Sequence, residues 1–153
     1  MKLKLEWGKP LYLKAPKNSI SYSFDLSKLP DRPGIYIFGR KYGKQIEALY
    51  VGKAGRLRGR VKGQLNNLHL MEHINSAKNG KKIVLAAKFV AGPAQQEEKC
   101  LTILERALIR YFLAEGHDLV NKQGTQIRRH EITSQGGGSA VPKLMFVDRP
   151  KGE

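Results

Sequence analysis

The sequence predicts one α/β (α+β) domain in which a small sheet is covered by helices. Three runs of β-branched, aromatic or other apolar residues, at 33–39, 47–52 and 82–90, predict strands. Apolar residues that recur every three or four positions predict helices between the second and third strands and after the third. The expected order is therefore strand, turn, strand, helix, strand, helix.

The first two strands are expected to form a hairpin. The run "PGIYIFG" is bounded by Pro-Gly and Gly, and "EALYVG" follows it after the turn-like segment "KYGKQ". The third strand, "KIVLAAKFV", follows an Asn-Gly pair that favours a turn.

The helix before the third strand is expected within residues 56–79, with a break near Gly63, because its apolar residues are spaced by three or four. The helix after it is expected at residues 93–115. Pro93 lies in its predicted first turn, Glu97 and Glu98 lie near the positive N-terminal end, and Gly116 provides a stop.

Both ends of the chain are expected to lie outside this domain, which is predicted for residues 31–133. Residues 1–30, with three prolines, predict an extension that holds one or two short strands or turns. In residues 134–153, "SQGGGS" predicts a flexible linker. The following "KLMFVD" predicts either a short strand that docks back or an interaction tail.

Composition favours a polyanionic partner. The 153 residues are enough for one domain with a real core, and 28 Lys and Arg against 13 Asp and Glu give a net charge of +15. Nucleic acid is the first candidate; an anionic membrane surface, or a role in solubility alone, is the alternative. Cys100 is the single cysteine, the N-terminus lacks the apolar run of a signal peptide, and "IVLAA" is too short to span a bilayer. We therefore expect a soluble, cytoplasmic protein without a membrane partner.

Glu105 is the most informative residue of the last helix. On an ideal helix it falls inside the apolar arc that contains Leu101, Leu104 and Leu108. Burying a carboxylate there without a partner is costly. It either pairs with a neighbouring cation, is rotated toward solvent, or faces a metal ion or a positive cluster near the sheet.

Two tyrosines end the first two strand-like runs, and basic residues follow the second at once. Gly52 lies two residues after Tyr50, and a glycine there would let a backbone or phosphate approach closely. Lys53 and Arg60 could then meet a phosphate beside Tyr50, whereas the alternative is that Tyr36 and Tyr50 are ordinary strand tyrosines.

These residues resemble the two-part signature of the GIY-YIG nuclease superfamily. "GIY" ends at Tyr36, and the Tyr50 of "YVG" follows fourteen residues later. Arg60 on the first helix, Glu105 in "LERALIRYF" and Asn121 in "LVNKQG" continue the family's order, so that the resemblance covers about residues 33–123.

The resemblance implies a three-stranded antiparallel sheet and hydrolysis of DNA phosphodiester bonds with one Mg²⁺ (or Mn²⁺) ion. It implies that Glu105 holds the metal and that Tyr50, assisted by Tyr36, is the general base. Arg60, with Lys53, would stabilise the phosphate, and Asn121 would support the site. These roles suit the residue types, since Mg²⁺ prefers carboxylates and water, and an arginine fork matches phosphate oxygens.

One position departs from the family pattern. Many members carry His or Tyr one turn after the arginine, but this chain has Gln64, which cannot accept a proton in the same way. His69 or His73 could contribute instead if the helix bends. The same two histidines form "HLMEH", which matches a zinc-peptidase pattern but lacks an evident third ligand, so that ordinary surface histidines are favoured.

Three functions compete: a metal-dependent endonuclease, a non-catalytic nucleic-acid-binding module on the same fold, and a basic adaptor for a membrane or an acidic protein. For the first two, a set of basic side chains is expected to contact phosphates. They are Lys53, Arg56, Arg58, Lys62, Arg128 and Arg129. For each of these taken alone, a solvated basic face remains the simpler interpretation.

Overall fold

The computed structural model describes residues 1–15, 17, 22–120 and 127–150, with the backbone alone at 127–131 and 146–150. The chain divides into two compact units, Met1–Asn121 and Lys122–Glu153. The first unit contains a five-stranded sheet with helices, and the second contains a two-stranded hairpin. No helix within the described ranges is long and apolar enough to cross a membrane.

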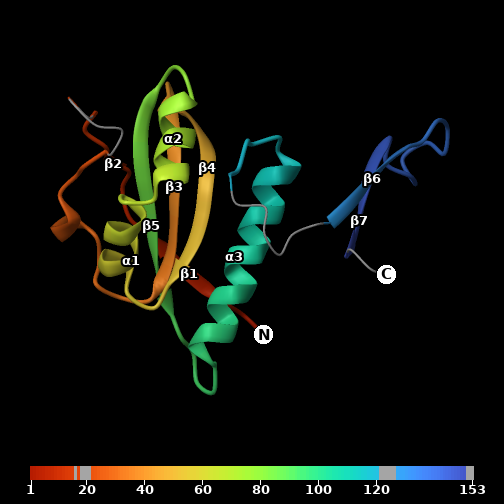
Figure 1. Cartoon of the computed structure of the whole chain (residues 1–153). Coiled ribbons are helices and arrows are strands. Elements are labelled where there is room, and N and C mark those ends of the chain that lie inside the picture. The colour runs from red at the N-terminus through yellow and green to blue at the C-terminus, as the bar shows by residue number, and fades with distance from the viewer. Residues whose placement is uncertain (16, 18–21, 121–126, 151–153) are drawn as a thin grey trace. The chain divides into compact units, whose positions relative to one another are not determined.

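The sheet is antiparallel and is built around three long strands, β3 (Gly34–Tyr42), β4 (Gln45–Ala54) and β5 (Lys81–Val90). Its order is β1-β5-β3-β4, with β2 also paired to β5, so β4 lies at one edge (Figure 1). The predicted strands, their order and the hairpin are therefore confirmed.

The expected number of three strands is wrong, because the N-terminal extension adds two more. β1 (Lys4–Trp7) and β2 (Leu11–Tyr12) pair with β5, with Lys4 opposite Val90 and Tyr12 opposite Ile83. They cover the edge of β5 that would otherwise present unpaired backbone groups. The short strands predicted for the extension thus belong to the first unit's sheet.

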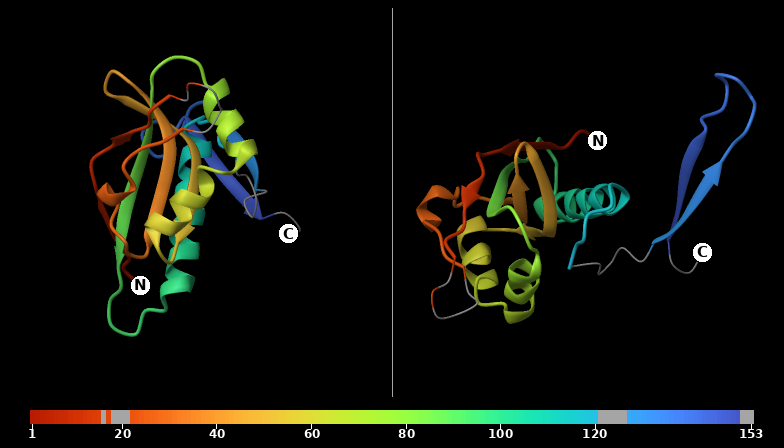
Figure 2. Two further views of the ribbon diagram at one scale, coloured as in Figure 1. Left: turned by 60° about the vertical axis from the view of Figure 1, so that its left-hand side comes forward. Right: turned by 90° about the horizontal axis from the view of Figure 1, so that it is seen from above.

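Helices cover both faces of this sheet. Figure 2 shows α1 (Leu57–Gln64) and α2 (Leu68–Ser76) on one face and α3 (Glu97–Ala114) on the other. Successive residues of β3 point to opposite faces, so Tyr36 and Phe38 pack in the core under α1 and α2, whereas Ile35 and Ile37 pack under α3. Full burial of each such side chain contributes about 1.5–3 kcal/mol.

The expected break in the first helical stretch is present as two separate helices. α1 ends at Gln64 and α2 begins at Leu68, where the Asn67 carboxamide oxygen accepts a hydrogen bond from the Leu70 amide at 3.2 Å. Asn67 therefore begins a new helix rather than extending the first.

The last helix of the first unit begins four residues later than expected. α3 starts at Glu97, so Pro93 precedes it, and Glu97 and Glu98 lie in its first turn. It ends at Ala114, and Gly116 follows with a φ of 84°. A short 3-10 helix (Leu26–Lys28), which leads into β3, is capped by the Asp25 side chain at the Ser27 amide, at 3.0 Å.

The second unit corrects the predicted linker. β6 (Ile127–Thr133) and β7 (Leu144–Pro150) pair antiparallel, and the glycine-rich residues 134–139 belong to the connection between them. The Ser134 amide donates to the Lys143 carbonyl at 2.9 Å, and Gly136, Gly137 and Gly138 all adopt positive φ. "KLMFVD", for which either a docked strand or an interaction tail was expected, forms a strand that pairs with β6 within the second unit. The units divide after Asn121, not at the expected borders 30/31 and 133/134.

Candidate active site

Tyr36 and Tyr50 lie side by side on the sheet face that α1 and α2 cover. Their ring centroids are 5.9 Å apart and the planes differ by 22°, as in a stacked pair. Phe38 packs edge-on against both rings, at 5.9 and 6.4 Å. Tyr36 is fully buried and Tyr50 is half-buried, so of the two rings only that of Tyr50 reaches the surface.

The glycine beside Tyr50 makes room for Tyr36, which differs from the expected clearance for a phosphate. Gly52 is the cross-strand partner of Tyr36, and a Cβ on Gly52 would overlap the phenol ring of Tyr36. Gly34 is required by a similar approach, because a Cβ there would overlap the Ala87 carbonyl of β5. The two glycines of the signature therefore serve packing within the sheet.

We expect Gly52→Ala to lower the free energy of unfolding by about 1–3 kcal/mol, the usual cost of overpacking a core. The Tyr36 ring is fully buried between Phe38 and Tyr50 and has no space to move. Gly59→Ala is the matched control, since a Cβ there meets open space on α1 and raises helix propensity. Equal urea midpoints for the two variants would contradict this account of Gly52.

Gln64 joins the two tyrosine hydroxyls. Its Nε2 donates to the Tyr36 hydroxyl at 2.8 Å and to the Tyr50 hydroxyl at 2.9 Å, and its Oε1 accepts from Asn67 Nδ2 at 3.1 Å. With both amide protons and the oxygen in use, the side chain has one favourable orientation. Gln64 thus acts as a donor that fixes both hydroxyls, and Asn67, which sequence reasoning missed, orients it. The pattern "NNLHL", an asparagine before an apolar run, was the available signal.

Tyr36 is held in its protonated form. Burial is the main cause that raises the pKa of Tyr36, and a negative charge on Tyr50 would raise it further. Hydrogen bonds from Gln64 and Arg60 lower the pKa but do not offset burial. Arg60 is exposed on α1 and so reaches the tyrosine pair from the solvent side.

Glu105 reaches the free edge of β4 from α3. Its Oε2 accepts a hydrogen bond from the backbone amide of Lys53 at 2.9 Å. The carboxylate is half-buried and, among described residues, forms no ion pair within 4 Å. Burial raises its pKa, while the Lys53 amide and the charges of Lys53, Arg60 and Arg106 lower it. Arg60 therefore influences both Tyr36 and Glu105, and so links α1 to α3 electrostatically.

Two residues that follow α3 also bond backbone groups along the edge of β4. The imidazole Nδ1 of His117 accepts from the Ala48 amide at 2.8 Å, and the Val120 amide donates to the Leu49 carbonyl at 2.9 Å. Sequence reasoning missed His117, because a histidine after a helix carries no distinctive pattern.

The predicted phosphate-binding cations differ in what they contact. The Lys53 ammonium bonds Glu98 and, at 2.9 Å, the Thr102 hydroxyl, both on α3 and away from Tyr50. Arg58 donates to the carbonyls of Leu29 and Ser27, at 2.7 and 3.1 Å, and so fixes the segment before β3.

Four candidate cations are exposed on or before α1, namely Arg56, Arg58, Arg60 and Lys62, and of these Arg58 bonds the two carbonyls named above. The side chains of Arg128 and Arg129 and the whole of Asn121 lie outside the described residues. Their predicted roles stay predictions.

The two histidines of "HLMEH" lie in different environments. His69 is exposed, while His73 Nε2 contacts the Asp118 carbonyl at 2.9 Å. Across the described ranges, no three His, Cys, Asp or Glu side chains gather as a metal cluster. A lone carboxylate such as Glu105 still suits Mg²⁺, which commonly takes one or two carboxylates and completes its shell with water and phosphate oxygens.

Comparison with protein families, with curated proteins and with solved structures gives no match for this chain.

Proposed function

We propose that this chain is a divalent-metal-dependent endonuclease that hydrolyses DNA phosphodiester bonds. The supporting observation is that Arg60 of α1 acts on both Tyr36, which stacks on Tyr50, and Glu105 of α3, which bonds the Lys53 amide at the edge of β4. A phenol, a guanidinium and a half-buried carboxylate are the groups that activation of water, stabilisation of phosphate and binding of a hard cation require. The sequence resemblance to GIY-YIG nucleases leads to the same assignment.

Each side chain has a distinct role in this proposal. Tyr50, as the general base, takes the proton from water as the water oxygen attacks phosphorus and the bond to the leaving oxygen breaks. Arg60 donates to the non-bridging oxygens as their charge increases. Glu105 would hold Mg²⁺ or Mn²⁺, which supplies charge neutralisation at the phosphate. Gln64 and Tyr36 position the Tyr50 hydroxyl.

The deciding experiment is cleavage of supercoiled plasmid with Mg²⁺ and with EDTA. We expect nicked or linear product only with the metal. Binding to DNA without cleavage under either condition would favour the non-catalytic module instead. Binding to neither plasmid nor duplex oligonucleotides would leave the adaptor function.

Arg60→Ala is expected to reduce the cleavage rate by roughly two to three orders of magnitude, the usual effect of removing one donor to a developing oxyanion. Arg60→Lys should restore little, because the ammonium lacks the planar fork. Arg110→Ala is the control, since it removes one exposed arginine from α3 that has no predicted role in the site. Single-turnover rates on plasmid measure all three, and full activity in Arg60→Lys would reduce Arg60 to a general electrostatic contact.

A further inference from the structure

Four lysines gather at the end of the sheet where β3 turns into β4 and β5 begins. Lys41 of β3 is the cross-strand partner of Lys81 of β5. The turn before β5 lies close to β3, since a Cβ on Gly80 would crowd the Lys41 carbonyl. Lys78 precedes that turn, and its carbonyl accepts from Arg40. Lys44 lies in the turn between β3 and β4.

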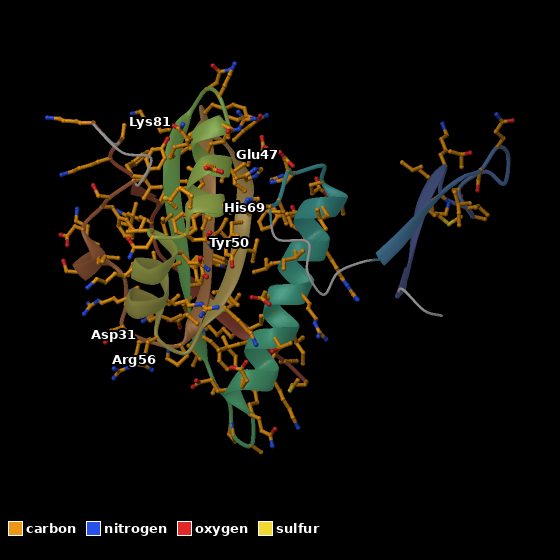
Figure 3. All side chains as sticks on the ribbon, in the orientation of Figure 1. Asp31, Glu47, Tyr50, Arg56, His69 and Lys81 are labelled. Carbon is orange, nitrogen blue, oxygen red and sulfur yellow. The ribbon has the colours of Figure 1, made fainter. Side chains whose placement is uncertain are left out.

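This end lies away from the basic residues before α1. Figure 3 shows Tyr50 near the middle of the sheet, Arg56 toward one end and Lys81 toward the other. We call the sheet-end surface the group Tyr12, Lys41, Tyr42, Lys44, Lys78 and Lys81.

The sheet-end surface keeps like charges in direct opposition. Lys41 faces Lys81, and on the next rung Arg40 faces Lys82. Like charges opposite one another across a strand pair are destabilising. Arg40 is compensated by Glu47, at 2.7 Å, and Lys82 donates to the Ala77 carbonyl.

The four lysines have no such compensation. Among the described residues, no carboxylate lies within ion-pair distance of Lys41, Lys44, Lys78 or Lys81. Unfavourable arrangements, such as like charges paired across strands, are expected at functional sites when no opposite charge within the protein offsets them. The missing counter-charge therefore points to an external polyanion.

Two exposed aromatic rings accompany these cations. The Lys81 ammonium lies over the Tyr12 ring at 5.5 Å, and the Arg40 guanidinium lies over the Tyr42 ring at 5.4 Å. The two tyrosines are 49% and 43% exposed. Lysine ammonium groups and tyrosine hydroxyls are both groups that contact the phosphate oxygens of duplex DNA. Peripheral membrane binding would instead need an apolar side that enters the lipid, and Ile46, the cross-strand partner of Lys41, is only partly exposed.

We propose that the sheet-end surface is a second DNA-contact site, which holds duplex phosphates at a distance from the bond that is cut. Tyr50 lies opposite Phe38, and three residues of β3 separate Phe38 from Lys41, or about 10 Å of strand at 3.4 Å per residue. At 3.4 Å per base pair this corresponds to about three base pairs. The inference rests on the proposed function only in taking the polyanion to be the nuclease substrate.

The test is binding of a 20-base-pair duplex in EDTA, measured by fluorescence anisotropy over a salt series. We expect Lys41→Gln/Lys81→Gln to reduce the slope of log affinity against log salt by about two and the affinity at 0.1 M salt by roughly fiftyfold. The melting temperature should stay equal or rise, because the repulsion is removed. Lys2→Gln/Lys99→Gln makes the same charge change at two exposed lysines and should alter neither binding nor melting.

Several outcomes would overturn the proposal. One is an unchanged slope in the Lys41→Gln/Lys81→Gln variant, or an equal loss in the Lys2→Gln/Lys99→Gln control. Another is a loss of binding to phosphatidylserine vesicles but not to DNA. If the double variant fails to fold, Lys44→Gln, in the turn, should still reduce the slope by about one. Because binding is measured without metal, absence of plasmid cleavage would refute the proposed nuclease function separately.

Discussion

Glu105→Gln is expected to abolish metal-dependent cleavage of DNA while leaving DNA binding in EDTA unchanged. Glutamine keeps the shape of the side chain and an oxygen that accepts from the Lys53 amide. It removes the negative charge that a hard divalent cation requires from its protein ligand. Plasmid cleavage at the wild-type rate in Mg²⁺ would show that Glu105 does not hold the metal.

The same variant should be at least as stable as the wild-type protein at pH 7 in EDTA. Burial raises the pKa of Glu105, so the folded state binds this proton more tightly than the unfolded state. The contribution of Glu105 to stability is therefore greatest at acid pH and is lost as the pH rises through the raised pKa. Glutamine removes the cost of partly burying a charged carboxylate at pH 7. A melting temperature below that of the wild-type protein at pH 7 would contradict this prediction.

Tyr50→Phe is expected to lose nearly all cleavage with little change in melting temperature. The ring and its stacking on Tyr36 remain, and only the hydroxyl bonded to Gln64 is removed. Tyr36 cannot replace it, because Tyr36 is fully buried and burial raises its pKa. Single-turnover rates and thermal melts of the purified variant measure the two effects.

The pH profile of cleavage by the wild-type protein gives an independent check. Cleavage should increase into the alkaline range, as a phenol or a metal-bound water loses its proton. Persistent activity in Tyr50→Phe, with a rate that follows a group near pH ~6.5, would instead indicate histidine. His69, which is exposed, would then be tested before His73, which is bonded to the Asp118 carbonyl.

The long elements could be predicted because each is specified by its own residues. β3 and β5 are apolar on both faces, since helices cover both, and α3 repeats apolar residues at helical spacing. β1 and β2 hold four and two residues and gain their structure from pairing with β5, which no local pattern expresses. The glycines of residues 134–139 suit a linker and a hairpin connection equally, because glycine gives a linker its flexibility and also allows the positive φ that the connection adopts.

The candidate site could be predicted by residue type but not by contact. Tyr36, Tyr50, Arg60 and Glu105 were named from the order of the motif, yet that order does not show that Gly52 makes room for a ring. Gln64 was identified as a departure from the pattern. Its bonds to both hydroxyls depend on how α1 packs against the sheet, which is a tertiary property.

The groups that bond the edge of β4 also protect the protein from self-association. An open edge strand is a template on which another chain can add a strand and begin to aggregate. In this protein His117, Val120 and Glu105 occupy backbone groups of β4, so three of its bonding positions are already in use. Glu105, the side chain proposed for metal binding, thus also blocks the addition of another strand at the Lys53 amide. Glutamine at position 105 would preserve this protection, whereas alanine would leave the Lys53 amide open to a neighbouring molecule.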